Sequence, residues 1–290
     1  FDNVTLGFLQ GAKIAFLGLN GCGKSSLMKI LAGVEEEFDG DFWKKDDLKV
    51  GYLAQEPELN AKLNVRENVM EALRKEQDLL KRFEEISLEM GEPDADFDKL
   101  IEEQGVITEE IDKYDAWTID DKVNQAMQAL RVPEDDLSVE HLSGGERRRI
   151  ALCRLLLEKP DMLLLDDVQF FVGKEQTQEQ FFHLFNDLYQ KEKQIILTTD
   201  RHPRKLVGLQ ERLVSRFQSG LITDIQAPDL ETRIAIIMNE AKHGGINIDY
   251  SIVEFIANSV TKDIRVMKSL LVRLQAISTL KNIDIDIDLC

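Results

Sequence analysis

The sequence predicts an α/β fold built around a mainly parallel sheet. Apolar runs with the length and composition of buried parallel strands lie at Lys13–Leu17, Met162–Leu165 and Gln194–Thr199. A glycine-rich loop directly follows the first run and precedes a helix-patterned segment at 25–31. A long, charged, helix-patterned segment, 67–127, lies between the first two runs. We therefore expect a sheet of parallel strands interrupted by an inserted helical arm.

The loop after the first strand carries the strongest chemical signal. Residues Gly18-Leu-Asn-Gly-Cys-Gly-Lys24-Ser25 fit the pattern GxxxxGK[ST]. In such a P-loop the backbone N–H groups wrap phosphates, the lysine meets the β and γ oxygens, and the serine can ligate Mg²⁺. We expect ATP and Mg²⁺ here, and the alternative is a glycine-rich turn without nucleotide. The expected binding residues are Gly18, Asn20, Gly21, Cys22, Gly23, Lys24, Ser25 and Ser26.

The second strand delivers acids. Asp166 and Asp167 follow the four apolar residues Met162–Leu165 directly. A carboxylate at the end of a buried parallel strand is suited to a metal-bound nucleotide, because ligands bind at the carboxyl ends of such strands. We expect Ser25 and Asp166 to hold Mg²⁺.

A second glycine-rich site opens the helix-patterned segment 147–158. The residues Leu142-Ser143-Gly144-Gly145-Glu146 place a serine and two glycines at a helix N-terminus. Such a site is either an anion cradle or a simple helix cap. Together with the P-loop and Gln55 it resembles the signature of ATP-binding-cassette proteins, which implies that Gln55, Ser143, Gly144 and Gly145 take part in nucleotide binding.

The resemblance extends to one branch of that superfamily. The segments Gly11-Ala-Lys-Ile, Gly51-Tyr-Leu-Ala-Gln-Glu-Pro57, Val65-Arg-Glu-Asn68 and 142–162 resemble the ABC-F translation factors, and their first cassette in particular. This resemblance covers about residues 1–166. It implies ATP-dependent action on the ribosome, reached through the arm at 67–127. The arm is equally consistent with a solvated helical hairpin, since it is charged along its length.

The chain departs from the ABC-F pattern after Leu165. That family continues with Asp-Glu-Pro-Thr-Asn and later has Thr-His-Asp, whereas this chain has Asp166-Asp-Val-Gln-Phe-Phe and Thr198-Thr-Asp. Asp167 therefore stands at the catalytic glutamate position and is one methylene shorter. Thr199 stands at the switch-histidine position and has no imidazole to protonate near neutral pH. Both departures predict weak hydrolysis.

From Asp166 onward the sequence resembles a different family, the DnaA-type bacterial replication initiators of the AAA+ class. The matching segments are 166–171, 173–183, 194–201, 211–217 and 228–234. The resemblance implies a Walker B pair at Asp166 and Asp167, a sensor 1 group at Asp200 and a C-terminal helical lid. It implies an arginine finger at Arg216 and a sensor 2 residue at Arg265, although the motif around Arg265 departs from the family's. Ordinary surface salt bridges are the alternative for these arginines.

Composition and charge limit the function further. The 290 residues carry a formal net charge of −18. The three cysteines, Cys22, Cys153 and Cys290, are far apart and are typical of reduced thiols in a cytoplasmic protein. Residues 1–165 carry 36 acids and 21 bases (net −15), and residues 166–290 carry 18 and 15 (net −3). This field repels phosphate and disfavours nucleic-acid binding, but it allows self-association.

Three hypotheses remain open on the sequence alone. The chain is an ABC-F-type fragment acting in translation, a DnaA-type fragment acting in replication, or a recombined or misassembled frame without an evolved combined function. We expect five segments: a P-loop part (1–66), the arm (67–127), the signature helix and acidic strand (128–166), an AAA+ core part (167–226) and the lid (227–290). The start at Phe1 predicts a fragment, and double-stranded DNA binding is not expected because the initiators' DNA-binding domain would lie beyond residue 290.

Overall fold

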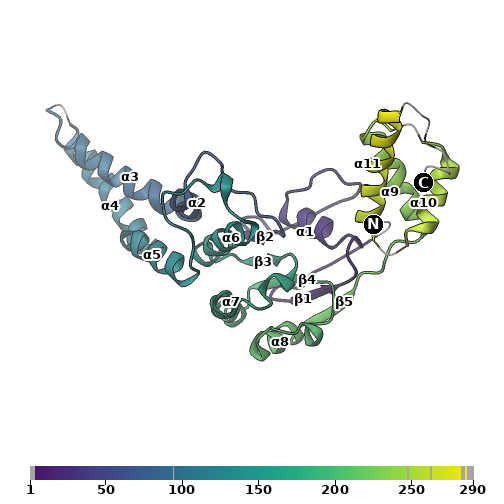
Figure 1. Cartoon of the computed structure of the whole chain (residues 1–290). Helices are drawn as coiled ribbons and strands as arrows, with labels where there is room; N and C mark the ends of the chain where they lie inside the picture. Colours follow the sequence, from purple (N-terminus) through teal and green to yellow (C-terminus); the bar gives the residue numbers. More distant parts are fainter. Residues whose placement is uncertain (1–3, 94, 247, 262, 282–284, 286–290) are drawn as a thin grey trace. The chain divides into compact units, whose positions relative to one another are not determined.

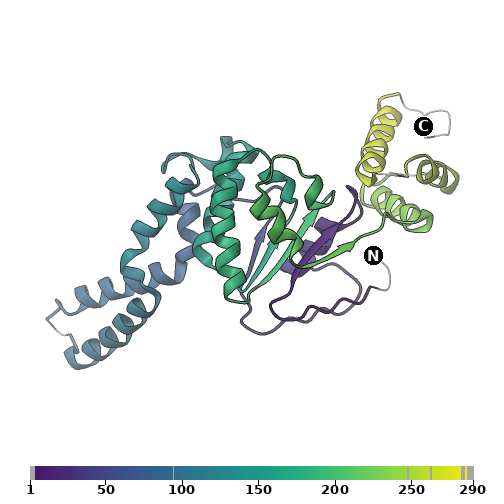
Figure 2. The same cartoon turned by 90° about the horizontal axis from the view of Figure 1, so that it is seen from below.

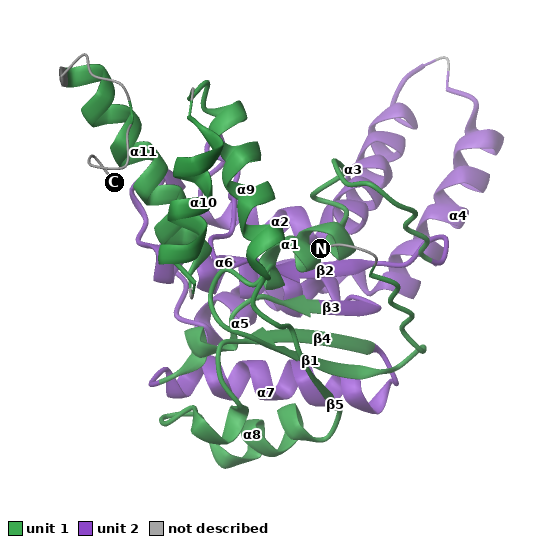
Figure 3. Cartoon of the chain, turned by 90° about the vertical axis from the view of Figure 1, so that its right-hand side faces the viewer, with its two compact units in different colours: residues 1–44, 164–172, 194–290 green, residues 45–163, 173–193 purple. Residues whose placement is uncertain are grey.

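The computed structural model describes residues 4–93, 95–246, 248–261, 263–281 and 285. Strands and helices both occur along the chain, with a run of helices between the second and third strands and another after the last strand (Figures 1 and 2). The chain divides into two compact units, each discontinuous in sequence (Figure 3). Unit 1 comprises residues 1–44, 164–172 and 194–290, and unit 2 comprises 45–163 and 173–193.

A five-stranded sheet forms the centre of the fold. The strands are β1 (Lys13–Leu17), β2 (Val50–Leu53), β3 (Met162–Leu165), β4 (Gln194–Thr199) and β5 (Leu221–Asp224), in the order β2-β3-β4-β1-β5. Strand β1 runs parallel to both β4 and β5, and its register with β4 extends from Lys13↔Ile195 to Leu17↔Thr199. Every residue of β3 and β4 is buried. The predicted α/β class with a parallel sheet is confirmed.

The helices of unit 1 flank its strands and build the lid. Helix α1 (Lys24–Ala32) and helix α8 (Glu211–Gln218) lie on opposite faces of β1, β4 and β5 (Figures 1 and 3). Short 3₁₀ turns lie at Val168–Phe171 and Pro203–Lys205. The lid consists of α9 (Leu230–His243), α10 (Tyr250–Ser259) and α11 (Ile264–Lys281). It has its own hydrophobic core, which includes Ile237, Val253, Ile256, Met267 and Leu271.

Unit 2 contains the arm and the signature helix. Its helices are α2 (Val65–Met70), α3 (Arg74–Glu89), α4 (Phe97–Tyr114), α5 (Ile119–Ala129), α6 (Gly144–Glu158) and α7 (Glu175–Gln190). Short 3₁₀ turns lie at Glu71–Leu73, Ala116–Thr118 and Val139–His141. Helices α3 and α4 pack side by side as a hairpin.

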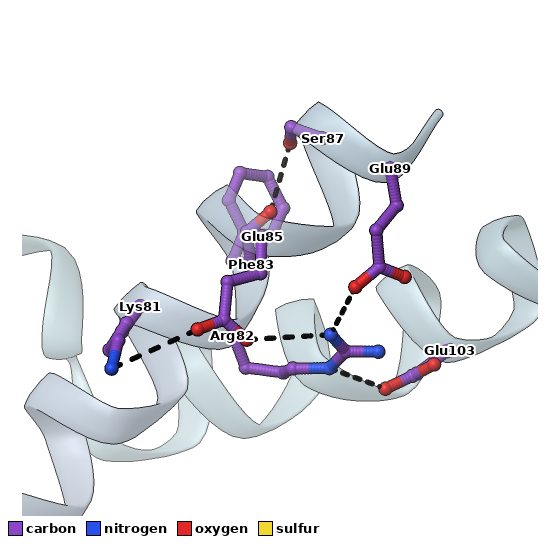
Figure 4. Close-up of polar contacts among 7 residues, drawn as sticks. All are labelled: Lys81, Arg82, Phe83, Glu85, Ser87, Glu89 and Glu103. Atoms are coloured by element: carbon purple, nitrogen blue, oxygen red, sulfur yellow. Dashed lines mark hydrogen bonds and ion pairs between the residues drawn. The ribbon is translucent and has the colours of Figure 1, made fainter. Parts of the chain in front are cut away.

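One arginine links the two helices of this hairpin. The Arg82 guanidinium reaches Glu85 at 3.4 Å and Glu89 at 2.7 Å on α3, and Glu103 at 2.8 Å on α4 (Figure 4). The hydrogen bonds to Glu103 and Glu89 raise the pKa of Arg82, and the same Arg82 contact lowers the pKa of Glu103. The ion pair with Glu103 thus joins α3 to α4, in addition to the buried apolar residues Ile86 and Ile111 of the two helices.

Within the described ranges, no helix has both the length and the hydrophobicity of a membrane span.

Candidate nucleotide-binding site

The P-loop joins β1 to α1 within unit 1. The Gly18 N–H donates to the Thr199 carbonyl at 3.2 Å, so the start of the loop is tied to the end of β4. Lys24 is only 8% exposed, and its ammonium group donates to the carbonyls of Gly18 (2.6 Å) and Leu19 (3.0 Å). A buried ammonium group needs such partners, and β- and γ-phosphate oxygens would be stronger ones. The lysine is therefore held at the loop that is expected to receive phosphate.

Two glycines of the loop have no room for a side chain. A Cβ atom at Gly18 would lie 2.5 Å from the Cys22 Sγ and 2.7 Å from the Ile225 carbonyl oxygen. Gly21 has φ +83°, and a Cβ there would lie 2.8 Å from the Ile264 nitrogen. Cys22 is buried, and its Sγ fills the space beside Gly18. The backbone thus comes close to neighbouring backbone on two sides of the loop.

The remaining loop residues continue into α1. Ser25 is partly buried and Ser26 is exposed in the first turn of this helix, after Gly23 with φ +99°. The first turn of a helix leaves N–H groups without intrahelical acceptors, and its positive end favours anions. Asn20 is exposed within the loop.

The acidic pair follows β3 and meets the end of β4. Asp166 is 5% exposed, and its Oδ1 accepts a hydrogen bond from the Thr198 hydroxyl at 2.7 Å. The Asp167 N–H donates to the same hydroxyl oxygen at 2.8 Å. Asp167 has φ +66°, a left-handed conformation that is unusual for a residue other than glycine. The Asp166 carboxylate is thereby fixed at the carboxyl edge of the sheet.

Two residues of unit 1 offer oxygen donors suited to Mg²⁺. Magnesium prefers carboxylate and hydroxyl oxygens and keeps several waters. Asp166 offers a buried carboxylate whose Oδ2 has no hydrogen bond to any described residue, and Ser25 offers a hydroxyl one position after the P-loop lysine. These two donors fit a magnesium ion bound together with nucleotide oxygens.

The loop after β4 holds Asp200. Arg201 binds the Asp200 carboxylate with both ends of its guanidinium, at 3.0 Å (Nε to Oδ1) and 2.9 Å (Nη2 to Oδ2). The Thr199 hydroxyl donates to the Arg201 carbonyl at 2.7 Å, which fixes the turn. The predicted sensor group therefore has a neighbouring arginine as its partner, which the sequence reading did not anticipate.

The two predicted arginines of unit 1 lie in different surroundings. Arg265 is exposed in the first turn of α11, and its N–H donates to Asp263 Oδ1 at 2.8 Å. This turn is the part of the lid that approaches Gly21 through Ile264. Arg216 is partly buried on α8, on the face of the sheet opposite α1 (Figure 3). The fold brings the neighbourhood of Arg265, but not that of Arg216, to the P-loop of the same chain.

The signature residues and Gln55 belong to unit 2. Ser143 caps α6: its hydroxyl accepts from the Glu146 N–H at 3.3 Å, and the Glu146 carboxylate accepts from the Ser143 N–H at 2.8 Å. The Ser143 hydroxyl also donates to the Glu146 carboxylate at 2.6 Å, and this bond, together with the one from the Ser143 N–H, lowers the pKa of Glu146. Gly144 and Gly145 form the first turn, and Arg148 donates to the Gln55 carbonyl. The helix-cap alternative therefore describes the local geometry of this motif.

Thr198 was missed by the sequence reading. It is fully buried and contacts both Asp166 and Asp167, the two acids after β3. A threonine inside the otherwise apolar strand Gln194–Thr199 is the signal that could have identified it, because a buried hydroxyl needs hydrogen-bond partners.

Comparison with known protein families decides the family of the chain. The family model described as ABC transporter matches residues 1–169, more than half of the sequence. The chain belongs to the ABC transporter family. A second family model, the bacterial DnaA ATPase domain, matches residues 137–224. The two matches overlap from 137 to 169, the stretch that holds the signature helix and the acidic strand.

Curated relatives of the chain divide in the same way. The energy-dependent translational throttle protein EttA of Escherichia coli (strain K12) is 45% identical over 202 residues, covering 69% of this chain and 36% of that protein. EttA of Mycobacterium tuberculosis (strain H37Rv) is 47% identical over 184 residues, covering 63% and 32%. The chromosomal replication initiator protein DnaA of Chlorobaculum tepidum is 42% identical over 158 residues, covering 54% and 32%. The chain spans about a third of the length of these relatives.

A solved structure supports the fold. Domain III of the Thermotoga maritima replication initiation protein DnaA superposes with a TM-score of 0.50 at 22% sequence identity, covering 95% of this chain and 80% of that chain. Both resemblances seen in the sequence, to ABC-F translation factors and to DnaA, are thus confirmed.

Proposed function

We propose that the chain binds ATP together with Mg²⁺ at the P-loop of unit 1 and hydrolyses it weakly. The observation that carries this proposal is the buried Lys24, held on the carbonyls of its own glycine-rich loop between a parallel strand and a helix. The ABC transporter family model matches residues 1–169, a range that includes this loop, and this match supports ATP as the ligand.

Each residue of the proposed site has a defined role. Lys24 contacts the β- and γ-phosphates, and the loop N–H groups and the N-terminus of α1 bind the remaining phosphate oxygens. Ser25 and Asp166 hold Mg²⁺, which neutralises phosphate charge when bound. Asp167 orients the attacking water, and Asp200 contacts it from the loop after β4. Hydrolysis is weak because Asp167 is shorter than glutamate and Thr199 cannot take the proton that a histidine would.

A nucleotide titration tests ATP binding. We expect a fluorescent ATP analogue to bind the wild-type chain and to lose most of its affinity in Lys24→Ala, because the phosphates lose their charged donor. Lys29→Ala, an exposed lysine on the same helix, is the matched control and should bind like the wild type. Equal affinities for wild type and Lys24→Ala would remove ATP binding from the proposal.

For the biological role we propose translation, with the arm as the ribosome-facing part and the cytoplasm as the location. The arm of residues 67–127 contains the α3–α4 hairpin, and Leu88 and Phe97 are exposed near its tip. EttA, a translational throttle protein by name, covers 69% of this chain, more than the other curated relatives compared. Ribosome pelleting with ATP should co-sediment the wild type, and Leu88→Glu should reduce the pelleted fraction. A wild-type chain that stays in the supernatant would reject this role.

Replication is the second candidate, because the DnaA ATPase match covers 137–224 and includes Asp166, Asp200 and Arg216. In that case Arg216 would reach the γ-phosphate of a neighbouring copy. ATP-dependent self-association that disappears in Arg216→Ala would favour this candidate. A joined frame without combined function is the third, and single sequencing reads that cross codons 160–172 of the source genome without a break would reject misassembly.

A further inference from the structure

The end of β4 contacts both halves of the proposed nucleotide site. Strand β4 lies between β3, which delivers the acids, and β1, which leads into the P-loop. On one side the Thr198 hydroxyl meets Asp166 and Asp167, and on the other the Thr199 carbonyl accepts from the Gly18 N–H at 3.2 Å. Two consecutive threonines therefore bridge the acid pair and the phosphate loop.

The direction of the hydrogen bonds at Thr198 follows from chemistry. A backbone N–H can only donate, so the Asp167 amide uses the hydroxyl oxygen as its acceptor at 2.8 Å. The hydroxyl proton is then free to point at Asp166 Oδ1, 2.7 Å away. Thr198 is fully buried, so no water competes for either contact. One hydroxyl thus fixes a carboxylate oxygen and the amide of the next residue at the same time.

This arrangement has two consequences for the acids. With Oδ1 engaged, Oδ2 is the oxygen that Asp166 presents to a cation. The amide contact also holds Asp167 in its left-handed conformation, with φ +66°, which an aspartate adopts at a steric cost. Removing the hydroxyl would release the Asp166 carboxylate and the turn that carries Asp167 together.

We propose that Thr198 is a positioning residue for magnesium: its hydroxyl orients the Asp166 carboxylate toward the metal and holds the Asp167 turn in place. This proposal rests on the proposed function, ATP–Mg²⁺ binding at the P-loop. It assigns to β4 a role that is independent of Asp200, since Asp200 is paired with Arg201 in the following loop.

The test separates metal positioning from a purely structural role. Affinity for a fluorescent ATP analogue is measured in Mg²⁺ and in EDTA for the wild type, Thr198→Val, Thr198→Ser and Thr177→Val. Valine has the shape of threonine without the hydroxyl, and serine restores the hydroxyl. Thr177 is a buried threonine of α7 in unit 2 and controls for the loss of a buried hydroxyl elsewhere.

Mg²⁺ should increase the ATP affinity of the wild type, and we expect this increase to be smaller in Thr198→Val by a factor on the order of ten. Such a factor corresponds to the loss of one hydrogen bond to a charged group. Its affinity in EDTA should match the wild type, and Thr198→Ser should recover most of the loss. Thr177→Val should show the wild-type gain. Hydrogen exchange at the Asp167 amide should be faster in Thr198→Val and close to wild type in Thr198→Ser.

Two results would overturn the positioning role alone: an undiminished Mg²⁺ gain in Thr198→Val, or equal losses in Mg²⁺ and EDTA. A wild-type chain that binds no nucleotide in either buffer would instead overturn the proposed function, and the positioning role with it. The wild-type titration therefore distinguishes the two failures.

Discussion

Replacing Asn68 with alanine should destabilise unit 2 by about 3 kcal/mol. Asn68 is fully buried in α2, at the base of the arm, and its side chain holds the loop before the helix. Its Oδ1 accepts from the Asn60 N–H at 2.8 Å, and its amide group lies 2.8–3.1 Å from the carbonyls of Asn60, Leu63 and Asn64.

The magnitude follows from the number of protons available. The Asn68 side-chain amide has two N–H protons, so its three carbonyl contacts count as two donated hydrogen bonds. The Asn68 Oδ1 accepts one more, which makes three in total. Three hydrogen bonds at about 1 kcal/mol each give about 3 kcal/mol. Against a total stability of about 5–15 kcal/mol, this loss is large enough to measure without abolishing the fold.

Urea unfolding followed by tryptophan fluorescence is the assay. Trp117 reports on unit 2, since it packs edge-on against Phe83 with ring centroids 5.2 Å apart and donates to Asp112 at 2.9 Å. Trp43 is 85% exposed and is replaced by phenylalanine in all variants to leave one reporter. Asn258→Ala, an exposed asparagine, should change stability by less than about 0.5 kcal/mol. A loss below about 1 kcal/mol for Asn68→Ala would refute the reasoning, because it would equal a single hydrogen bond.

Three further predictions follow from other contacts. Burial raises the pKa of Glu158, so the folded chain binds the Glu158 carboxyl proton more tightly than the unfolded chain, and the stability that this proton contributes at low pH is lost as the pH rises through the folded pKa. Glu158→Gln should therefore flatten the pH dependence of the urea midpoint above about pH 4, whereas a curve parallel to that of the wild type would contradict this. Gly21→Ala should lower both thermal stability and ATP affinity, because the new Cβ would lie 2.8 Å from the Ile264 nitrogen. Gly33 has φ +73° and open space around it, so Gly33→Ala should show the effect of backbone strain alone, and equal losses of stability and affinity in the two variants would exclude a role for the lid contact. Arg82→Met should speed hydrogen exchange in α3 and α4, since the three carboxylates lose their shared partner, and the difference in exchange rate from the wild type should shrink in high salt. Exchange rates equal to those of the wild type would show that the ion pairs do not hold the hairpin together.

Local sequence patterns predicted the core elements of the site well. Strands β1 and β4 occupy Lys13–Leu17 and Gln194–Thr199, the ranges that their apolar composition indicated. Helix α6 begins at Gly144 rather than at 147, because the capping box of Ser143 and Glu146 stabilises the turn that contains both glycines. Patterns that depend on nearest neighbours along the chain are readable because their physics is local.

The contacts that complete the site join residues far apart in sequence, and no local pattern reports them. Thr198 meets Asp166 because β3 and β4 are neighbours in the sheet, and Ile264 meets Gly21 because the lid folds toward the loop. The pairing of Asp200 with Arg201 is different: its partners are adjacent, but its geometry depends on the turn that Thr199 fixes. Register and loop conformation decide these contacts, and both are set by tertiary packing.

The sequence resembles ABC-F translation factors before Asp166 and DnaA-type initiators from Asp166 onward. The central claim is that residues from both of these parts act on one bound nucleotide. A double-mutant cycle with Ser25→Ala and Asp166→Asn tests it through the affinity for ATP in Mg²⁺. If both side chains hold the same ion, the two losses overlap, and the double variant should be weaker than the wild type by less than their sum, with a coupling of about 0.5–3 kcal/mol. Strictly additive losses, or an unchanged affinity in Asp166→Asn, would contradict a single site.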